Sequence, residues 1–226
     1  MNQQQHPSKG RKAVNMTRFT FFRGFTLLEL LAVIAIMAIF AMLALPAFTH
    51  LNKAAALTNS ASLISDQLTA ARQSALSRSR VVEVRFYKLP GELKGSAKAY
   101  RAFRVFLYDE KVQNAFALTN LVKLLPGVVM PDDQNFSTIL NTSSNNRILT
   151  PATETLPGVT DPVTYQAFRF RSNGATDLDP SGAPAGDKWF LTLKAETDPV
   201  AGTQPAHNFV TLMIDPVSGR VRTFRP

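Results

Sequence analysis

The sequence contains no cysteine among its 226 residues, which excludes disulfide bonds, thiolate metal sites and a cysteine nucleophile. Histidine is also scarce: His6, His50 and His207 lie far apart in the chain and do not suggest a metal site. Serine, histidine and aspartate do not occur in a nucleophile elbow, a P-loop or an H-E-x-x-H motif. We therefore expect a protein that is not an enzyme and that uses no cofactor or metal.

Charge is nearly absent from one long stretch near the N-terminus. Of the 24 residues 25–48, only Glu29 is charged. A helix of that length spans about 36 Å, enough to cross a hydrocarbon core of ~30 Å. Residues 1–24 hold five basic residues and no acidic one, so the positive-inside tendency predicts a cytoplasmic N-terminus. Residues 25–226 then carry only +4 of the net charge of +9, which does not by itself indicate a nucleic-acid-binding protein.

Glu29 is the feature of this stretch that needs a partner. An ionised carboxylate in a bilayer costs on the order of ~3 kcal/mol, and no Lys, Arg or His lies between Phe25 and Pro46. Cleavage of the Gly24–Phe25 bond would create an α-amino group that could pair with Glu29 of the same chain or of a neighbour. An uncleaved signal anchor is one alternative. A membrane-anchored sensor or enzyme domain is another, but it explains the helix and not Gly24, Phe25 and Glu29 together.

Beyond Pro46, apolar residues recur at spacings of mostly three to five, which predicts an amphipathic helix over 49–80. Pro46 removes one helical hydrogen bond and is expected to kink or loosen the helix. We place the end of the helix near Arg80. Arg72, Arg78 and Arg80 suit the negative end of the helix dipole, and we interpret them as dipole compensation and as a source of solubility.

β-branched and aromatic residues then predict strands separated by turns that contain proline and glycine. Strands are expected at 81–87, 102–108, 122–130, 165–171, 189–195, 209–214 and 220–224. The first two form a hairpin, and the last two flank a turn in which Gly219 supplies a permissive φ angle. The segment from about 131 to 163 is expected to be a surface loop. One long helix followed by strands predicts an α+β fold in which the helix packs on an antiparallel sheet, within a head of residues 81–226.

Three arginines near the C-terminus form the first candidate binding site in the head. On a strand, Arg220 and Arg222 point to the same side, because side chains alternate with a period of two. Together with Arg225 they would form a cationic rim, and a guanidinium group can bind phosphate oxygens bidentately. The alternatives are a solvated hairpin, or arginines that pair with Asp215 or Glu83.

Residues 177–182 read D-L-D-P-S-G and look like the start of a calcium-binding loop. A complete EF-hand loop needs a glutamate at its twelfth position, which here is Lys188. We favour the alternative of an acidic turn between two strands. Trp189, the only tryptophan, is expected to anchor the core of the sheet rather than to stack against a base.

Residues 23–30, R-G-F-T-L-L-E-L, resemble the N-terminal signal of type IV prepilins and type II secretion pseudopilins, and the resemblance extends into the apolar run that follows. It implies that residues 1–24 are a cytoplasmic leader. A prepilin peptidase would remove this leader after Gly24 and methylate the new terminal Phe25. Glu29 would then be an assembly residue that pairs with Phe25 of a neighbouring subunit, under the action of an inner-membrane assembly platform.

The stretch LISDQLTAARQSALSRSRVVEVRF at 63–86 and the stretch GRVRTFRP at 219–226 make the chain from Gly24 onward resemble the GspH/FimT group of minor pseudopilins and minor pilins. Within the head, VVEVRFYKLP at 81–90 and IDPVSGRVRTFRP at 214–226 resemble the Verru_Chthon cassette protein D set. This implies a structural subunit of a type II secretion or related pseudopilus, whose partners are other pseudopilins or pilins. The subunit would be a single-pass inner-membrane protein among lipids before assembly, with a periplasmic head, and part of a filament afterwards. In the FimT-like branch, a Gly-Arg-x-Arg motif implies DNA binding during uptake, here through Arg220 and Arg222.

Overall fold

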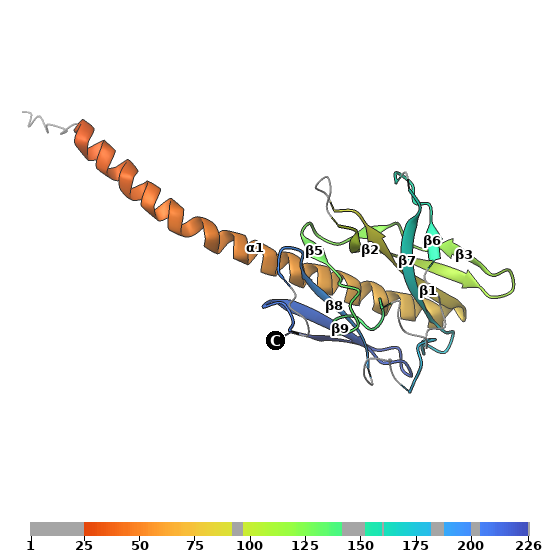
Figure 1. The fold of residues 1–226 in the computed structure, drawn as a ribbon. Coiled ribbons are helices and arrows are strands. Elements are labelled where there is room, and N and C mark those ends of the chain that lie inside the picture. The colour runs from red at the N-terminus through yellow and green to blue at the C-terminus, as the bar shows by residue number, and fades with distance from the viewer. Residues whose placement is uncertain are drawn as a thin grey trace, which may run out of the picture. The chain divides into compact units, whose positions relative to one another are not determined.

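The computed structural model describes most of the chain from Phe25 onward (Figure 1). The described ranges are 25–91, 97–141, 152–159, 161–181, 188–199 and 204–225, without the side chains of 43–50. The leader predicted for 1–24, including Gly24, lies outside the described residues. The chain divides into two compact units, Met1–Pro46 and Ala47–Pro226.

The long helix α1 runs from Leu27 to Arg78 and continues through Pro46. It ends as the sequence predicts, just before the first strand. Ser79 has a left-handed φ of 50°, its N–H donates to Leu76 O at 3.3 Å, and the Arg80 N–H donates to Ala75 O at 3.2 Å. This pair of bonds satisfies helix carbonyls that would otherwise lack donors, which is why the chain can turn sharply into the sheet.

The predicted α+β fold, a long helix packed on antiparallel β-structure, is confirmed. Among the described residues the strands form two antiparallel sheets, where the sequence suggested one. The six-stranded sheet has the order β3-β2-β1-β7-β6, with β4 also paired to β2. Its strands are β1 Val81–Leu89, β2 Ala99–Asp109, β3 Asn114–Ala117, β4 Val122–Lys123, β6 Ala152–Glu154 and β7 Val163–Phe170. The four-stranded sheet has the order β10-β9-β8-β5. Its strands are β5 Val128–Val129, β8 Trp189–Ala195, β9 Phe209–Ile214 and β10 Val221–Phe224. The predicted hairpins β1–β2 and β9–β10 are confirmed.

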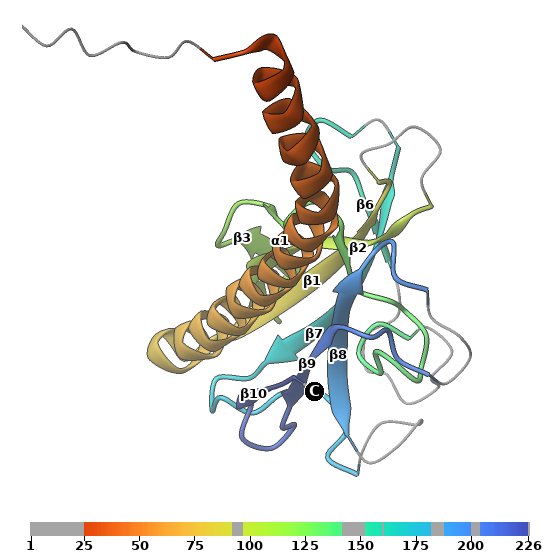
Figure 2. The same ribbon diagram turned by 90° about the vertical axis from the view of Figure 1, so that its left-hand side faces the viewer.

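The core of the head lies where α1 meets both sheets (Figures 1 and 2). The helix contributes residues spaced mostly by three and four, which form one stripe: Leu57, Ala61, Ile64, Leu68, Ala71 and Ala75. They pack in one cluster with inward-facing residues of β1, β8 and β9, such as Phe86, Trp189 and Leu212. Trp189 is 1% exposed and its indole N–H donates to Asp179 O at 2.8 Å, so the expected role as a core anchor is confirmed.

The prediction of a surface loop from about 131 to 163 is wrong for much of its described part. Phe136, Ile139 and Leu140 are buried, and β6 pairs with β7 inside this range. The polar residues Ser137 and Thr138 are buried because their hydroxyl groups accept hydrogen bonds from backbone N–H groups along the edge of β8. The Phe190 N–H donates to Thr138 Oγ1 at 2.8 Å, and the Thr192 N–H donates to Ser137 Oγ at 3.1 Å. The middle of the predicted loop, residues 142–151, lies outside the described residues.

Candidate functional site

The first turn of α1 holds Glu29 in a reciprocal cap. Thr26 precedes the first helical residue, and the Glu29 N–H donates to Thr26 Oγ1 at 3.2 Å. In return, the Thr26 N–H approaches Glu29 Oε2 at 3.5 Å. This is the capping-box arrangement, in which a threonine and a glutamate three residues later satisfy each other's backbone N–H groups. The cap involves only one carboxylate oxygen of Glu29, through a long contact of 3.5 Å. Glu29 forms no ion pair within the described residues.

The helix that follows this cap exposes apolar side chains all round. Between residues 25 and 42 every side chain is exposed, including Phe25 at 77%, Leu28 at 80% and Phe40 at 68%. A helix that is apolar on all faces is stable only when something other than water surrounds it. Within the part of the chain that the structure describes, no helix combines the length and the hydropathy of a membrane-crossing segment.

The three C-terminal arginines lie on the edge strand β10 and at its two ends, and all three are exposed. Arg222 is opposite Met213 of β9, and Arg220 immediately precedes β10. Arg225 donates through its guanidinium to Thr58 Oγ1 of α1 at 2.6 Å and to Asn208 Oδ1 at 3.2 Å. Arg220 and Arg222 form no ion pair within the described residues. Arg225 fastens the end of β10, and the cationic rim of the three arginines stays a prediction.

The ion pairs with Asp215 or Glu83 that the sequence left open do not form among the residues that the structure describes. The Asp215 carboxylate caps the β9–β10 turn, accepting the N–H groups of Val217 at 2.9 Å and Ser218 at 3.0 Å. The hydrogen bond from Ser218 is the main cause of the lowered pKa of Asp215, and the charge of Arg222 contributes. Glu83 is only 2% exposed and is occupied by other arginines.

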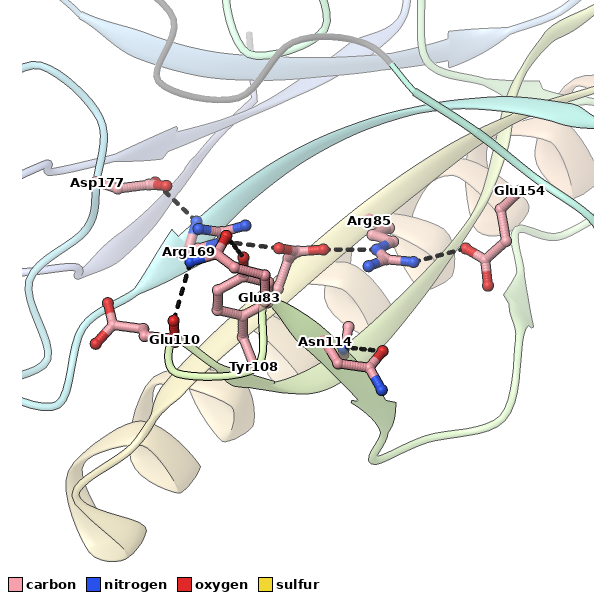
Figure 3. A network of polar contacts seen from close by, with 10 residues as sticks. Glu83, Arg85, Tyr108, Glu110, Asn114, Glu154, Arg169 and Asp177 are labelled. Atoms are coloured by element: carbon pink, nitrogen blue, oxygen red, sulfur yellow. Dashed lines mark hydrogen bonds and ion pairs between the residues drawn. The ribbon is translucent and has the colours of Figure 1, made fainter.

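Glu83 belongs to a chain of four charged side chains on the face of the six-stranded sheet opposite α1 (Figure 3). Arg85 Nε lies 2.6 Å from Glu83 Oε1, and Arg85 Nη1 lies 2.8 Å from Glu154 Oε2. On the other side, Arg169 Nε lies 2.7 Å from Glu83 Oε2. Two acids and two guanidinium groups alternate, so the buried carboxylate is balanced on both oxygens. The arrangement ties β6 and β7 to β1, and we interpret it as structural.

Aromatic rings line this charged chain. The Arg85 guanidinium lies 4.2 Å from the ring centroid of Phe106 and 4.6 Å from that of Tyr165. Arg169 lies 3.5 Å from the ring centroid of Tyr108. Rings at these distances attract a cation and exclude water from it.

The acidic turn at 177–179 is built from hydrogen bonds. Asp177 Oδ1 accepts the Arg169 N–H at 2.7 Å, and Asp179 Oδ1 accepts the Ser181 N–H at 2.8 Å. Burial raises the pKa of Asp177 to about 6. No group of three potential metal ligands occurs among the described residues, although Gly182 and Asp187 lie outside them.

One residue of the site was missed by sequence reasoning. Arg72 was interpreted as dipole compensation, but its Nε–H donates to Ser218 O at 2.8 Å and to Gly174 O at 3.2 Å. It therefore holds the β9–β10 turn, from which Arg220 emerges, against α1. The spacing of 146 residues between Arg72 and Ser218 left no local signal in the sequence.

Comparison with known proteins gives a family match near the N-terminus of the chain. Residues 21–45 match the model of the prokaryotic N-terminal methylation motif, a range that contains Gly24, Phe25 and Glu29. A search of curated proteins gave no significant match. Among solved structures, the chain is similar to the crystal structure of the type IV minor pilin FimU of Pseudomonas aeruginosa strain PAO1. The likeness is weak, with a TM-score of 0.41 and 12% identity, and covers 79% of this chain and 96% of that chain.

Proposed function

We propose that this type IV pilin-like protein, which joins the N-terminal methylation motif to a helix packed on antiparallel sheets, is a minor pseudopilin of a type II secretion or related pseudopilus. Its role is structural and not enzymatic. A prepilin peptidase removes residues 1–24 and methylates Phe25, and an inner-membrane platform then moves the subunit from the lipid into a filament. The head stays on the periplasmic side throughout.

The observation that carries this proposal is the contrast between Glu29 and its surroundings. It is the only charge in residues 25–48, and its side chain has no counter-charge among the described residues. The cap from Thr26 satisfies part of one oxygen, which leaves room for a second donor. The amine of a processed Phe25 on a neighbouring subunit supplies such a donor together with a positive charge. That pairing offsets the desolvation cost of both groups and sets the axial register between subunits.

Processing can be tested in cells by the intact mass of the membrane-extracted chain. The wild-type protein should begin at a methylated Phe25, and Gly24→Leu should retain residues 1–24. A Gly24→Leu chain that is processed and functions normally would overturn the proposal in favour of a membrane-anchored domain of another kind.

Assembly can be tested by site-specific crosslinking between the helices of two subunits. Glu29→Gln should be processed normally but lose the crosslinks, because the uncharged amide cannot neutralise the Phe25 amine. Asp66→Asn is the matched control, since it also removes one carboxylate from α1 but does so within the unit Ala47–Pro226. Equal crosslinking by Glu29→Gln and the wild type would remove Glu29 from the assembly mechanism.

A second function, DNA capture by a minor pilin, is supported by one observation: Arg220 and Arg222 are exposed and have no ion pair among the described residues. The full chain in neutral detergent would be titrated against a fluorescent DNA duplex across a salt series. Affinity that falls with salt, with a slope reduced by about one for each arginine replaced by alanine, supports DNA capture. Absence of binding at low salt, or indifference to both substitutions, leaves only the secretion-type subunit.

A further inference from the structure

The turn that carries Arg220 is unusually constrained by its neighbours. Gly219 is buried, with a left-handed φ of 64°. A Cβ atom at this position would lie 2.1 Å from Gly174 O and 3.2 Å from Arg72 Cδ and Nε. The glycine is therefore required both by its backbone conformation and by the close approach of a second turn.

That second turn comes from the other sheet. Residues 171–175 follow β7, and the Gly174 N–H donates to Arg171 O at 2.8 Å. The two turns are also joined directly, because Thr176 donates to Pro216 O through its N–H at 2.9 Å and its Oγ1 at 3.1 Å. Two turns that are distant in sequence thus lie together against α1.

Arg72 is the side chain of α1 that bonds both turns at once. Its Nε–H is shared between Ser218 O and Gly174 O, which are carbonyl groups on the two sides of the junction. Arg220 and Arg222, which follow the β9–β10 turn in the chain, are exposed to solvent. A fixed backbone at Ser218 and Gly219 limits the directions in which Arg220 can project.

We propose that Arg72 is the positioning residue for the Arg220–Arg222 edge, and that its Nε–H, rather than its charge, holds the β9–β10 turn so that both arginines meet neighbouring phosphates of a nucleic-acid backbone. The positioning role follows from the contacts of Arg72, whereas the ligand rests on the second function proposed above. Its consequence is that DNA affinity depends on a side chain that does not itself contact phosphate.

Two substitutions separate hydrogen bonding from charge. In Arg72→Gln, the amide nitrogen occupies the topological position of Nε, so the bonds to Ser218 and Gly174 persist without the positive charge. In Arg72→Lys, a methylene replaces Nε, so the charge persists without those bonds. Arg78→Gln is the control for loss of one exposed arginine elsewhere on α1.

The first readout is DNA binding by the full chain in neutral detergent, with a fluorescent duplex and a salt series. We expect Arg72→Lys to lose affinity several-fold, and Arg72→Gln to bind like Arg78→Gln with the wild-type salt slope. The reverse pattern, in which Arg72→Lys binds normally and Arg72→Gln lowers the slope by about one, would show Arg72 to be a phosphate contact and overturn the positioning role.

The second readout does not involve DNA. Hydrogen exchange of the peptide that covers residues 215–222 should accelerate in Arg72→Lys and stay slow in Arg72→Gln. If the wild type does not bind DNA, the second function fails, and the exchange result alone decides whether Arg72 holds the turn. Unchanged exchange in Arg72→Lys overturns the positioning role whatever the DNA result.

Discussion

The two units of this chain differ in how they accommodate an acidic side chain. In the N-terminal unit, Glu29 stands among exposed apolar side chains with only the first helical turn as its partner among the described residues. In the head, Glu83 is buried and receives a guanidinium group on each oxygen. The charge of Glu83 is therefore neutralised within the head. The charge of Glu29 and the apolar side chains around it, in contrast, require partners from outside the chain. We expect substitutions in the head to alter stability and those in the N-terminal unit to alter assembly.

The largest effect on the stability of the head should come from Glu83→Ala. It leaves two neighbouring guanidinium groups without their shared counter-charge, and breaking a buried pair in this way costs about 3–5 kcal/mol. Urea unfolding of the full chain in detergent, followed by tryptophan fluorescence of the buried Trp189, would measure the loss. Asp132→Ala is the control, because its pair with Lys88 is exposed and should contribute no more than about 1 kcal/mol. Equal losses from the two variants would contradict the structural role of the network.

Gly219→Ala should come next. The left-handed φ costs about 1–3 kcal/mol, and the contact with Gly174 O adds to that cost. Gly127→Ala isolates the first contribution, because Gly127 has a φ of 78° but no atom lies within 4 Å of the place that an added Cβ would take. The difference between the two variants in urea unfolding measures the close approach of the turns. No difference would mean that the two turns separate without cost.

Asp177→Asn should change how the stability depends on pH. Burial raises the pKa of Asp177 from 3.8 to about 6, so the folded state holds a proton that the unfolded state has lost between these values. Stability should therefore fall as the pH rises from about 4 through about 6, by at most ~3 kcal/mol. Asn keeps the acceptor for the Arg169 N–H and cannot ionise, so this decline should flatten. If Asp177→Asn shows the same decline in stability as the wild type, another titratable group causes the decline.

Glu29→Leu should have the smallest effect on the head, with no change in its urea midpoint. Among the described residues, the hydrogen bonds of Glu29 stay within the first turn of α1, and leucine continues the apolar surface of residues 25–42. Loss of crosslinks between subunits, measured in the same samples, should accompany this unchanged midpoint. A substantial shift of the midpoint would end the distinction between the two units.

Local periodicity was sufficient to predict α1, the β1–β2 and β9–β10 hairpins and the position of Gly219. The helix depends on the local apolar stripe from Leu57 to Ala75, and the β9–β10 hairpin depends on a short turn. The β1–β2 hairpin joins two strands that are neighbours in the chain. The contacts that define the site join residues that are far apart in the sequence. Glu83 meets Arg169 across 86 residues, and Arg72 meets Ser218 across 146, so neither pairing leaves a pattern in a single sequence.

The prediction of a surface loop rested on the polar run N-T-S-S-N-N at 141–146, and it is wrong for the segment around residue 137. Serine and threonine favour loops because their hydroxyl groups can bond nearby backbone. Here Ser137 and Thr138 use the same capacity to extend the edge of β8, and the neighbouring Ile139 enters the core. Hydrogen bonding from a hydroxyl group to nearby backbone usually indicates a loop, but here it allows Ser137 and Thr138 to be buried at the edge of a sheet.

The interleaving of the two sheets has a consequence for the order in which the head can fold. β5 precedes β6 and β7 in the chain, yet it pairs with β8, which joins Val128 to Ala195. The four-stranded sheet, which also packs against α1, cannot form until residues 189–224 are present. A growing chain would keep part of its helical stripe uncovered until β8 and β9 had been made, and such non-local pairing slows folding. Truncation by even the last two strands should therefore yield a chain that aggregates rather than a smaller head.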